Sequence, residues 1–543
     1  MIKDSSLELL GGIGIALCLV SPSWAEIRTI TATGEYRMGD NDSRTDAKRL
    51  ALLDAKRLAL EQAGVYIESI TEVKNLDLAK DEIRAYTAGI VEVIEHATRT
   101  MMEGETTLVR VDVKTKIDTE VVTRQIDTLR KNGDIKTRLL RAEAEALKLS
   151  KELEAKTREL AAAKSRTTIE EFAQQRKALV ARIESDELAT RAGRALVEAR
   201  RDSSIAGNPL VDAHKYVHEL LDRALRLDPE NPWAHSWMGA LLASEGRHEE
   251  SVRSYRAAVI LEPDSARAHV ELGVALDLSG YRAGAIKEFS TAIQKDPDFA
   301  LAYDFLGVSL AHDVTMNRIL PHEEKQRVYD YAVTLVRKAI KLEPSDARYH
   351  VSLGRMLTWD KGDIEAGLAE IRTALLLDPQ LPNAQIELGR LLEKMGDREG
   401  AIAAYRVAAQ SRSFALEAHR ALAYWLHESG SIEEAVAEYR ELIRLDLLQD
   451  PLDPSWAAAD HMQFGQFYEG KGLLEEATRQ YRAAFKFSDD RWYAHLLIQA
   501  LAKSGKKQEA SDVLREFLRR HPDDEQILKR DLKQDGLQLP DSE

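Results

Sequence analysis

The stretch PWAHSWMGALLASEGRHEESVRSYRAAVILEP at residues 232–263 decides the fold, because its pattern returns 34 residues later as ARAHVELGVALDLSGYRAGAIKEFSTAIQKDP at 266–297. In both copies an apolar residue precedes a Gly, and a small residue follows twelve positions after that Gly. An aromatic residue comes four positions further on, and a Pro closes each copy. Self-similarity at a fixed period of this length is typical of a repeat architecture.

The pattern continues through eight units. The central residue of each unit is followed by the next after 34, 34, 47, 35, 34, 42 and 34 residues. Small residues at this point and twelve positions later allow two antiparallel helices to approach closely, and a closing Pro stops the second helix. The central residues are Gly239, Gly273, Gly307, Gly354, Gly389, Ala423, Gly465 and Gln499.

This pattern closely resembles the tetratricopeptide repeat family. The resemblance implies a mainly α fold, an α-solenoid of about eight helix pairs over residues 230–522. A leading helix is expected over 207–229 and a capping tail over 523–543. One unit cannot bury its own apolar faces, so the units must stack. The longer spacings predict surface loops at His312–Lys325 and Leu447–Pro454.

The resemblance also implies a partner-binding groove, lined by positions two, five, nine, twelve and thirteen of each first helix. The early units then contribute a mostly apolar wall, and the middle units a basic wall with aromatic residues. We expect the partner to be an extended peptide or helix with apolar and acidic groups. The predicted groove residues are Trp233, Val270, Val274, Arg348, Val351, Arg355, Trp359, Ile386, Arg390, Lys394, Arg420 and Tyr424, with Arg267, Leu278, Leu301 and Val308 beside them.

Histidines recur at position four of the units, at His235, His269, His350, His419, His461 and His495. Adjacent units stack about a helix-pair width apart, so these side chains are too spread out to share one metal ion. They are therefore predicted to be packing residues. His214 and His218 lie four apart without an evident third ligand. No metalloprotease, phosphate-loop or nucleophile-elbow motif follows the leader, so no enzyme activity, cofactor or metal is expected.

The first residues predict a secretory signal peptide. Residues 9–20, LLGGIGIALCLV, form a short apolar run after Lys3, and Ser23-Trp24-Ala25 offers small residues for cleavage after position 25. A retained membrane anchor is the alternative, although the run is short for a span. Cys18 is the only cysteine and leaves with the leader, which favours a bacterial periplasm over a disulfide-stapled secreted domain.

Residues 26–125 predict a small α/β domain. Strands are expected at 27–33, 67–73, 90–100 and 107–117, with a turn at Glu103–Glu105, and helices at 45–62, ending at Gly64, and 78–87. The stretch from Ser43 to Val93 resembles the N-terminal domain of the flagellar assembly protein T family. That resemblance implies an envelope role, whereas a flagellar role does not follow from it. Asp40-Asn41-Asp42 fails as a calcium loop because its twelfth position is Ala51.

Residues 126–206 predict a helical arm with a coiled-coil pattern. Apolar or small residues recur at steps of three and four through Leu139, Ala142, Ala146, Leu149 and Leu153, and again at Leu160. One interpretation is a self-associating coil that joins two copies of the chain. The other is a helix that folds back on neighbours in the same chain.

The composition and net charge of the chain limit the classes of function that it can have. The chain has 543 residues and a formal net charge of -15, which argues against a sequence-independent nucleic-acid binder. We expect a non-enzymatic, exported periplasmic scaffold that holds a protein partner. The alternative is an assembly factor or chaperone for an envelope machine, such as a flagellar motor or a secretion system.

Overall fold

The computed structural model describes residues 27–39, 42–73, 82–83, 87, 91, 93–118, 122, 126, 133–163, 165–201, 209–316, 319–359, 362–411, 414–448 and 454–537. The chain forms two compact units, residues 1–190 and 191–543. Of the helices described, none combines the length and the apolar composition that crossing a bilayer requires.

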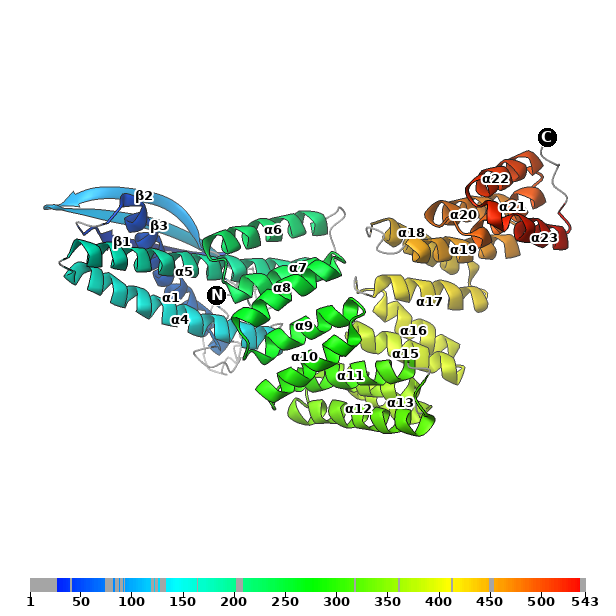
Figure 1. Cartoon of the computed structure of the whole chain (residues 1–543), viewed down its shortest axis with the longest axis horizontal. Coiled ribbons are helices and arrows are strands. Elements are labelled where there is room, and N and C mark those ends of the chain that lie inside the picture. Colours follow the sequence, from blue (N-terminus) through cyan, green and yellow to red (C-terminus); the bar gives the residue numbers. More distant parts are fainter. Residues whose placement is uncertain are drawn as a thin grey trace, which may run out of the picture. The chain divides into compact units, whose positions relative to one another are not determined.

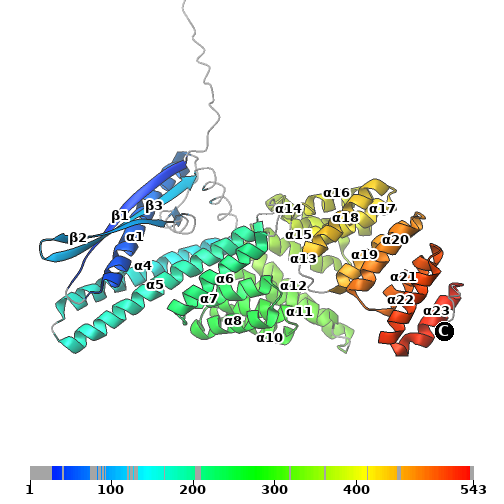
Figure 2. The same ribbon diagram turned by 90° about the horizontal axis from the view of Figure 1, so that it is seen from above.

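The first unit contains a three-stranded antiparallel sheet. Its strands are β1 (Ile27–Arg37), β2 (Ile94–Glu103) and β3 (Thr106–Asp118), in the order β1-β3-β2 (Figure 2). The hairpin between β2 and β3 turns at Gly104, whose φ of 65° suits a residue without a side chain. The hairpin turn expected from the sequence is therefore present.

Helix α1 (Arg44–Val73) covers one face of this sheet. A small or apolar residue recurs at every fourth position, which places one continuous stripe along the helix. The backbone of α1 approaches the sheet so closely that a side chain at Gly34 would overlap the backbone of Ala51 and Ala55. Each residue of the stripe is completely buried: Ala47, Ala51, Ala55, Ala59, Ala63 and Ile67.

Two predictions for this region are wrong: that residues 67–73 form a strand, and that the preceding helix ends at Gly64. Helix α1 runs through both positions to Val73. Ile67 continues the buried stripe and packs with Ile30 and Ile117 of the sheet, so tertiary burial overrides the local β-propensity of this segment. Most of the helix predicted at 78–87 lies outside the described residues.

The arm consists of two helices, α4 (Gly133–Ala162) and α5 (Arg166–Arg201), which run side by side in Figures 1 and 2. Leu153 of α4 packs with Val180 of α5 and Leu50 of α1. Leu149 and Leu160 are buried as well. These leucines therefore pack within one chain, in agreement with the second interpretation of the arm, and the coiled-coil seam of the first interpretation is already filled.

An ion pair joins α5 to the loop before α1. Arg176 lies 2.5 Å from Asp42, and only 4% of each side chain is exposed. Tyr36 donates to Asp42 at 2.9 Å and accepts from Arg176 at 3.0 Å. Burial raises the pKa of Tyr36 to about 12, and the Asp42 carboxylate contributes to this rise. Asp42, in the loop before α1, therefore fixes helix α5 of the arm to the small domain.

The second unit is a stack of helix pairs behind a leading helix, α6 (Pro209–Leu227) (Figure 1). The final pair is followed by a short 3-10 turn, η1 (Pro522–Asp524), and by α23 (Glu525–Gln534), whose buried Leu528 and Leu532 cap the last repeat. The eight described pairs are α7 (Pro232–Ser244) with α8 (His248–Leu261), α9 (Ala266–Leu278) with α10 (Arg282–Lys295), α11 (Ala300–Met316) with α12 (His322–Leu342), α13 (Ala347–Trp359) with α14 (Ile364–Leu377), α15 (Pro382–Met395) with α16 (Arg398–Ala408), α17 (Ala415–Glu428) with α18 (Ile432–Leu448), α19 (Pro454–Gly470) with α20 (Leu474–Phe487), and α21 (Arg491–Lys503) with α22 (Lys507–Arg520).

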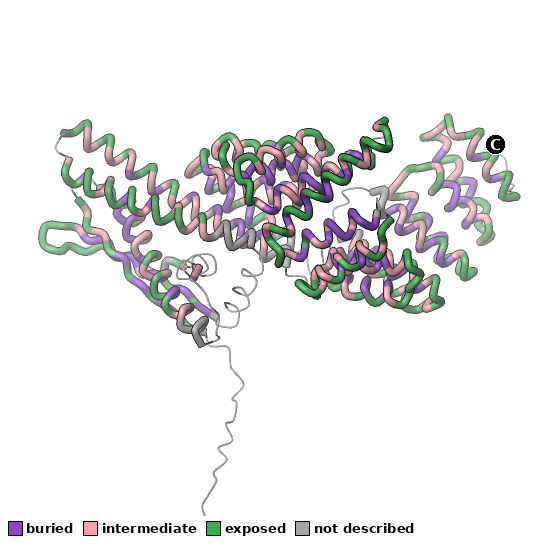
Figure 3. Tube along the Cα trace, turned by 90° about the horizontal axis from the view of Figure 1, so that it is seen from below, coloured by how far each residue is buried: buried purple, intermediate pink, exposed green. Residues whose placement is uncertain are grey.

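The central glycines explain how the two helices of a pair approach. A Cβ at Gly389 would lie 2.5 Å from the ring of Tyr405 on the facing helix, so the missing side chain makes room for the ring. At Gly307 the facing atoms are the Ala332 carbonyl oxygen and Val336. In Figure 3 the buried residues form stripes along the helices of each pair, with exposed residues on the other sides.

The surface loop predicted at His312–Lys325 is largely helical. Helices α11 and α12 contain 17 and 21 residues, whereas α9 and α10 contain 13 and 14. The insertion therefore lengthens both helices of the third repeat, where Val314 and Tyr329 are buried. Most of the loop predicted at Leu447–Pro454 lies outside the described residues.

Candidate partner-binding surface

The first helices of the repeats form one layer. Neighbouring first helices contact each other, as α7 does with α9 and α9 with α11. Each second helix instead contacts its own first helix and the first helix of the next repeat. We call α7, α9, α11, α13, α15, α17, α19 and α21 the first-helix layer. All twelve residues predicted to line a groove lie on it.

Three of these residues belong to the core. Val270, Val351 and Ile386 occupy position five of their units and are 3%, 1% and 1% exposed. Each packs against side chains of neighbouring helices. The stacking of repeats therefore already covers these three side chains, and whether they contact a partner stays a prediction.

The other predicted residues keep some exposure. Tyr424 is 49% exposed, and Arg348 and Lys394 keep part of their surface in solvent as well. The remaining described members are partly buried: Trp233, Val274, Arg355, Arg390 and Arg420. Trp359 ends α13, and its side chain lies outside what the structure describes. Whether any of these residues contacts a partner stays a prediction.

Two predicted arginines are paired across repeats. Arg390 of α15 forms ion pairs with Glu387, at 2.9 Å, and with Glu417 of the next first helix. Arg420 of α17 donates two bonds of 2.6 Å to Asp460 of α19, whose side chain is 1% exposed. Bidentate charge-assisted bonds of this kind are strong. These arginines therefore stabilise the stacking of repeats.

Sequence reasoning missed the carboxylates that hold these arginines. Glu417 is 27 residues from Arg390, and Asp460 is 40 residues from Arg420. The second spacing is two residues short of the local period of 42, and the first is seven residues, about two helical turns, short of the local period of 34. The repeat period is thus the signal that could have found them. A charged residue on the first helix of the next repeat lies close in space, because neighbouring first helices contact each other.

Glu393 of α15 forms a second polar link between repeats. It accepts a hydrogen bond of 2.7 Å from Tyr405 and another from Trp425 on α17. Burial raises the pKa of Tyr405, and the bond to Glu393 raises it further, so the phenol stays neutral and donates. The exposed Tyr424 stands edge-on to Trp425, with ring centroids 5.1 Å apart. Tyr424 thus lies next to this link, four residues after Arg420 on α17.

Comparison with known proteins identifies these helix pairs. Residues 238–298, 358–414 and 386–446 match the family described as tetratricopeptide repeat. The chain contains tetratricopeptide repeats. Among proteins of curated function, none is similar in sequence to this chain.

Several solved structures are similar to parts of the chain. A thermophilic tetratricopeptide repeat protein of Thermus thermophilus is 19% identical, with a TM-score of 0.34, and the match covers 36% of this chain and 99% of that one. YrrB, a tetratricopeptide repeat protein with an unusual peptide-binding site, is 17% identical with a TM-score of 0.24, covering 35% and 88%. The human IFIT1 dimer with PPP-AAAA is 14% identical with a TM-score of 0.39, covering 74% and 86%.

Most histidines at position four of the tetratricopeptide repeats bond to the second helix of their own repeat, whereas His495 pairs with Asp535 beyond the last repeat. His269 Nε2 lies 3.1 Å from the Pro263 carbonyl oxygen, and its Nδ1 lies 2.7 Å from Glu288 of the second helix. His350 reaches Glu370 in the same way, at 2.7 Å. Both nitrogens of His269 lie next to oxygen atoms, so this ring links the end of the preceding repeat to the second helix of its own repeat.

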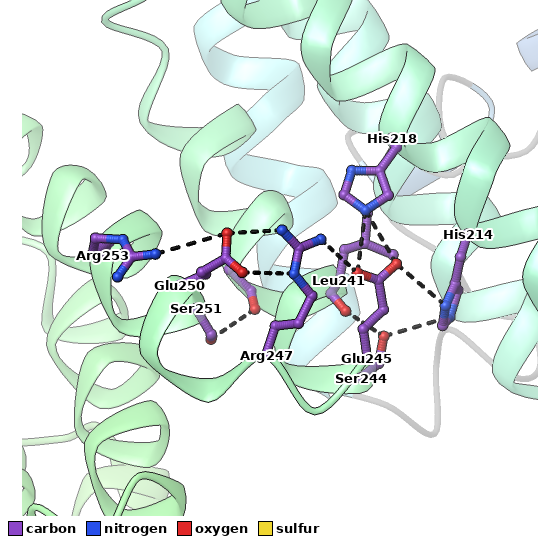
Figure 4. Close-up of polar contacts among 10 residues, drawn as sticks. His214, His218, Leu241, Ser244, Glu245, Arg247, Glu250, Ser251 and Arg253 are labelled. Carbon is purple, nitrogen blue, oxygen red and sulfur yellow. Dashed lines mark hydrogen bonds and ion pairs between the residues drawn. The ribbon is translucent and has the colours of Figure 1, made fainter. Parts of the chain in front are cut away.

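The two histidines of the leading helix converge on one carboxylate (Figure 4). His218 Nε2 lies 3.1 Å from Glu245 Oε1, and His214 Nδ1 lies 3.6 Å from the same oxygen. Arg247 donates to Glu245 at 3.2 Å and also pairs with Glu250. Within the described part of the chain, no group of three or more His, Cys, Asp or Glu residues could hold a metal ion. The cluster connects α6 to the turn of the first repeat.

Proposed function

We propose that the protein is an exported, periplasmic scaffold that holds a partner segment on the first-helix layer. Tetratricopeptide repeats form scaffolds for protein–protein interaction, and this chain has that fold. The observation that carries the proposal is the exposure of Tyr424 and Lys394 on this layer. The leader-like residues 1–25 support export.

The accessible side chains define the partner's chemistry. An aromatic or apolar side chain would stack on Tyr424, and an acidic group would meet Lys394, Arg348 or Arg355. Binding to Arg390 or Arg420 would require the partner to compete with Glu417 and Asp460, which already occupy these guanidinium groups. Arg348 is likewise bound to Asp346, so an acid that reaches it would compete with that carboxylate. The partner is therefore an extended segment that combines an aromatic or apolar anchor with a flanking acid.

A double variant tests the binding surface. Tyr424→Ala with Lys394→Ala removes accessible groups without touching a buried core residue. The matched control is Ile260→Ala with Leu376→Ala, because these second-helix residues are 73% and 84% exposed. After crosslinking in intact cells, the partner should be lost with the first variant and kept with the control. Retention in both variants would move the function to another surface.

The alternative function is assembly factor or chaperone for an envelope machine. The resemblance of residues 43–93 to the flagellar assembly protein T family favours it, because members of that family are associated with the envelope. Genes for a motor or secretion system beside this gene would support the alternative. Normal assembly of such machines in a deletion strain would exclude it.

Export is tested independently of binding. In a fractionated bacterial host, the chain should appear with periplasmic markers and begin at Glu26. A chain that keeps Met1 and sediments with membranes would instead support the retained anchor.

A further inference from the structure

Strand β2 lies at the edge of the three-stranded sheet and is open on both faces. The strand order β1-β3-β2 gives β2 only β3 as a neighbour. Helix α1 packs against β1 and β3, and every side chain from Thr98 to Glu103 is exposed. In Figure 3 the tip of the β2–β3 hairpin is likewise exposed. An edge strand of this kind presents a row of backbone N–H and C=O groups that can pair with another strand.

The opposite edge of the sheet, β1, is protected by the helix. The amide of Glu35 on β1 donates to the Asp54 carboxylate of α1 at 3.3 Å, so a side chain already occupies a backbone donor of this strand. Gly34 of β1 lies against the backbone of α1. Among the described residues, none of β2 belongs to the two clusters that form the core under this helix. The sheet is therefore open to a further strand at β2.

The outer part of β2 has the regular geometry that strand addition requires. Its register with β3 shifts once, between Glu95 and Ala97. From Ala97, opposite Asp112, to Glu103, opposite Thr106, the register is continuous. Proteins block unwanted pairing at an edge with bulges and prolines, among other devices. The stretch ATRTMME at 97–103 contains no Pro, and its pairing with β3 contains no bulge.

We propose that two copies of the chain pair through this edge, with β2 of one copy antiparallel to β2 of the other. Charge selects the register. With a twofold axis at Met101, Arg99 of each copy lies opposite Glu103 of the other, and opposite charges across two strands stabilise their pairing. An axis at Arg99 would oppose two guanidinium groups, which is destabilising. An axis at Thr100 would oppose Arg99 to Met101, without an ion pair.

The side chains of this face are already arranged as ion pairs that the second copy would extend. Arg99 lies 3.0 Å from Asp112, and Glu103 lies 2.9 Å from Arg37. Asp112 alternates along β3 with valines that pack on α1, so these four side chains lie on the opposite face of the sheet. Arg99 and Glu103 remain 67% and 54% exposed. Since a guanidinium group has five donors, Arg99 can keep Asp112 and bind Glu103 of the second copy.

The pairing also covers two exposed methionines. Met101, which is 37% exposed, lies on the axis against Met101 of the second copy. Met102, which is 66% exposed, lies opposite Thr100. Only residues 99–103 of each copy pair, whereas stable interfaces bury more than about 1,200 Å². We therefore expect a reversible dimer.

Cysteine substitutions read the register directly. Cys18 is the only native cysteine, so Cys18→Ser gives a full chain without a thiol. In this background Met101→Cys should form a disulfide-linked dimer under mild oxidation, because opposite residues of antiparallel strands have Cβ atoms about 4.5–5.5 Å apart. Thr100→Cys and Met102→Cys are the controls, since each thiol would lie diagonal to its own copy, about 7–8 Å away.

The pattern of crosslinks decides the proposal. A dimer at position 101 and none at positions 100 and 102 would support it. Dimers formed chiefly at position 100 or 102 would overturn the register, and no dimer at any position would overturn the pairing. If the Met101→Cys chain became linked to a different protein in cells, the occupant of this edge would not be a second copy.

Charge reversal in two separate chains tests the contact between residues 99 and 103. A homodimer of Arg99→Glu would oppose acid to acid at both contacts, and a homodimer of Glu103→Arg would oppose base to base. Mixing the two chains restores an acid–base pair at both contacts. Each chain is the same alone and in the mixture, so a loss of folding affects both measurements equally.

Native mass spectrometry of the mixture measures the outcome. The mixed dimer should exceed either homodimer by about tenfold or more. A mixed dimer in only the statistical amount would overturn the contact between Arg99 and Glu103.

Discussion

Gly307 offers the sharpest test of the repeat packing, because a backbone atom blocks the space beside it. A Cβ at this position would lie 2.8 Å from the Ala332 carbonyl oxygen, 2.8 Å from Val336 Cγ2 and 3.4 Å from Leu335 Cβ. Ala332 and Val336 are completely buried, so neither can move into solvent. Gly307→Ala must therefore push α11 and α12 apart, at a cost of about 1–3 kcal/mol.

Helix propensity partly offsets this cost. Alanine favours a helix interior over glycine by about 1 kcal/mol, so the net loss for Gly307→Ala is roughly 0–2 kcal/mol. Gly470 of α19 is the matched control, because no atom lies within 4 Å of its added Cβ. Gly470→Ala should keep part of the propensity gain without a clash. The two variants should therefore differ by about 1–3 kcal/mol.

Urea unfolding followed by circular dichroism measures this difference. Gly307→Leu extends the series, since its larger side chain should bring the loss to about 3 kcal/mol. If Gly307→Ala proved as stable as Gly470→Ala, the close crossing of α11 and α12 would be refuted.

Three further predictions concern single contacts. Arg176→Ala should cost about 3–5 kcal/mol by leaving Asp42 buried without its cation, and a double-mutant cycle with Asp42→Asn should recover part of the loss in thermal unfolding. Gly34→Val should unfold the small domain, because its Cβ would overlap the backbone of α1; limited proteolysis should cleave that domain while the repeats resist, and uncut protein would contradict the close approach. Arg420→Ala should also lower the free energy of unfolding by about 3–5 kcal/mol, because Asp460 would be buried without its cation. Replacing both partners, by Arg420→Met with Asp460→Leu, should restore much of the stability measured in urea. If the double variant did not recover, the ion pair would depend on further polar groups around it.

The repeats could be predicted because their pattern encodes the local packing of each pair. Gly389 and Tyr405 meet at the crossing of α15 and α16, and the spacing between such residues is the same in most units. Where the period lengthened, the sequence could not say whether the extra residues loop out or extend the helices. In the third repeat most of them extend the helices, and Val314 among them is buried.

The small domain was predicted less well because two patterns compete in it. The β-branched residues between Ile67 and Val73 favour a strand by propensity, whereas the four-residue stripe through Ala63 and Ile67 favours a helix. The segment is helical because the stripe can then be buried against the sheet. In the arm, the heptad pattern identified a buried face and could not say which helix covers it.

The candidate surface was predicted by position, and its chemistry was not. Family positions placed Arg390 and Arg420 on the first-helix layer, but their partners Glu417 and Asp460 become neighbours only when repeats stack. In the same way, Val270 would be an exposed apolar side chain in a single repeat, and it is buried when the repeats stack. Stacking therefore removes part of the surface that a single repeat suggests.

The central claim is that a partner binds the first-helix layer, and site-specific photocrosslinking tests it most directly. p-Benzoylphenylalanine would replace Tyr424 on this layer in one chain and Leu376 on a second helix in another, since both side chains are well exposed. Irradiation in living cells should link one discrete partner at position 424 and none at position 376. Partner adducts only at position 376, or equally at both positions, would contradict the claim.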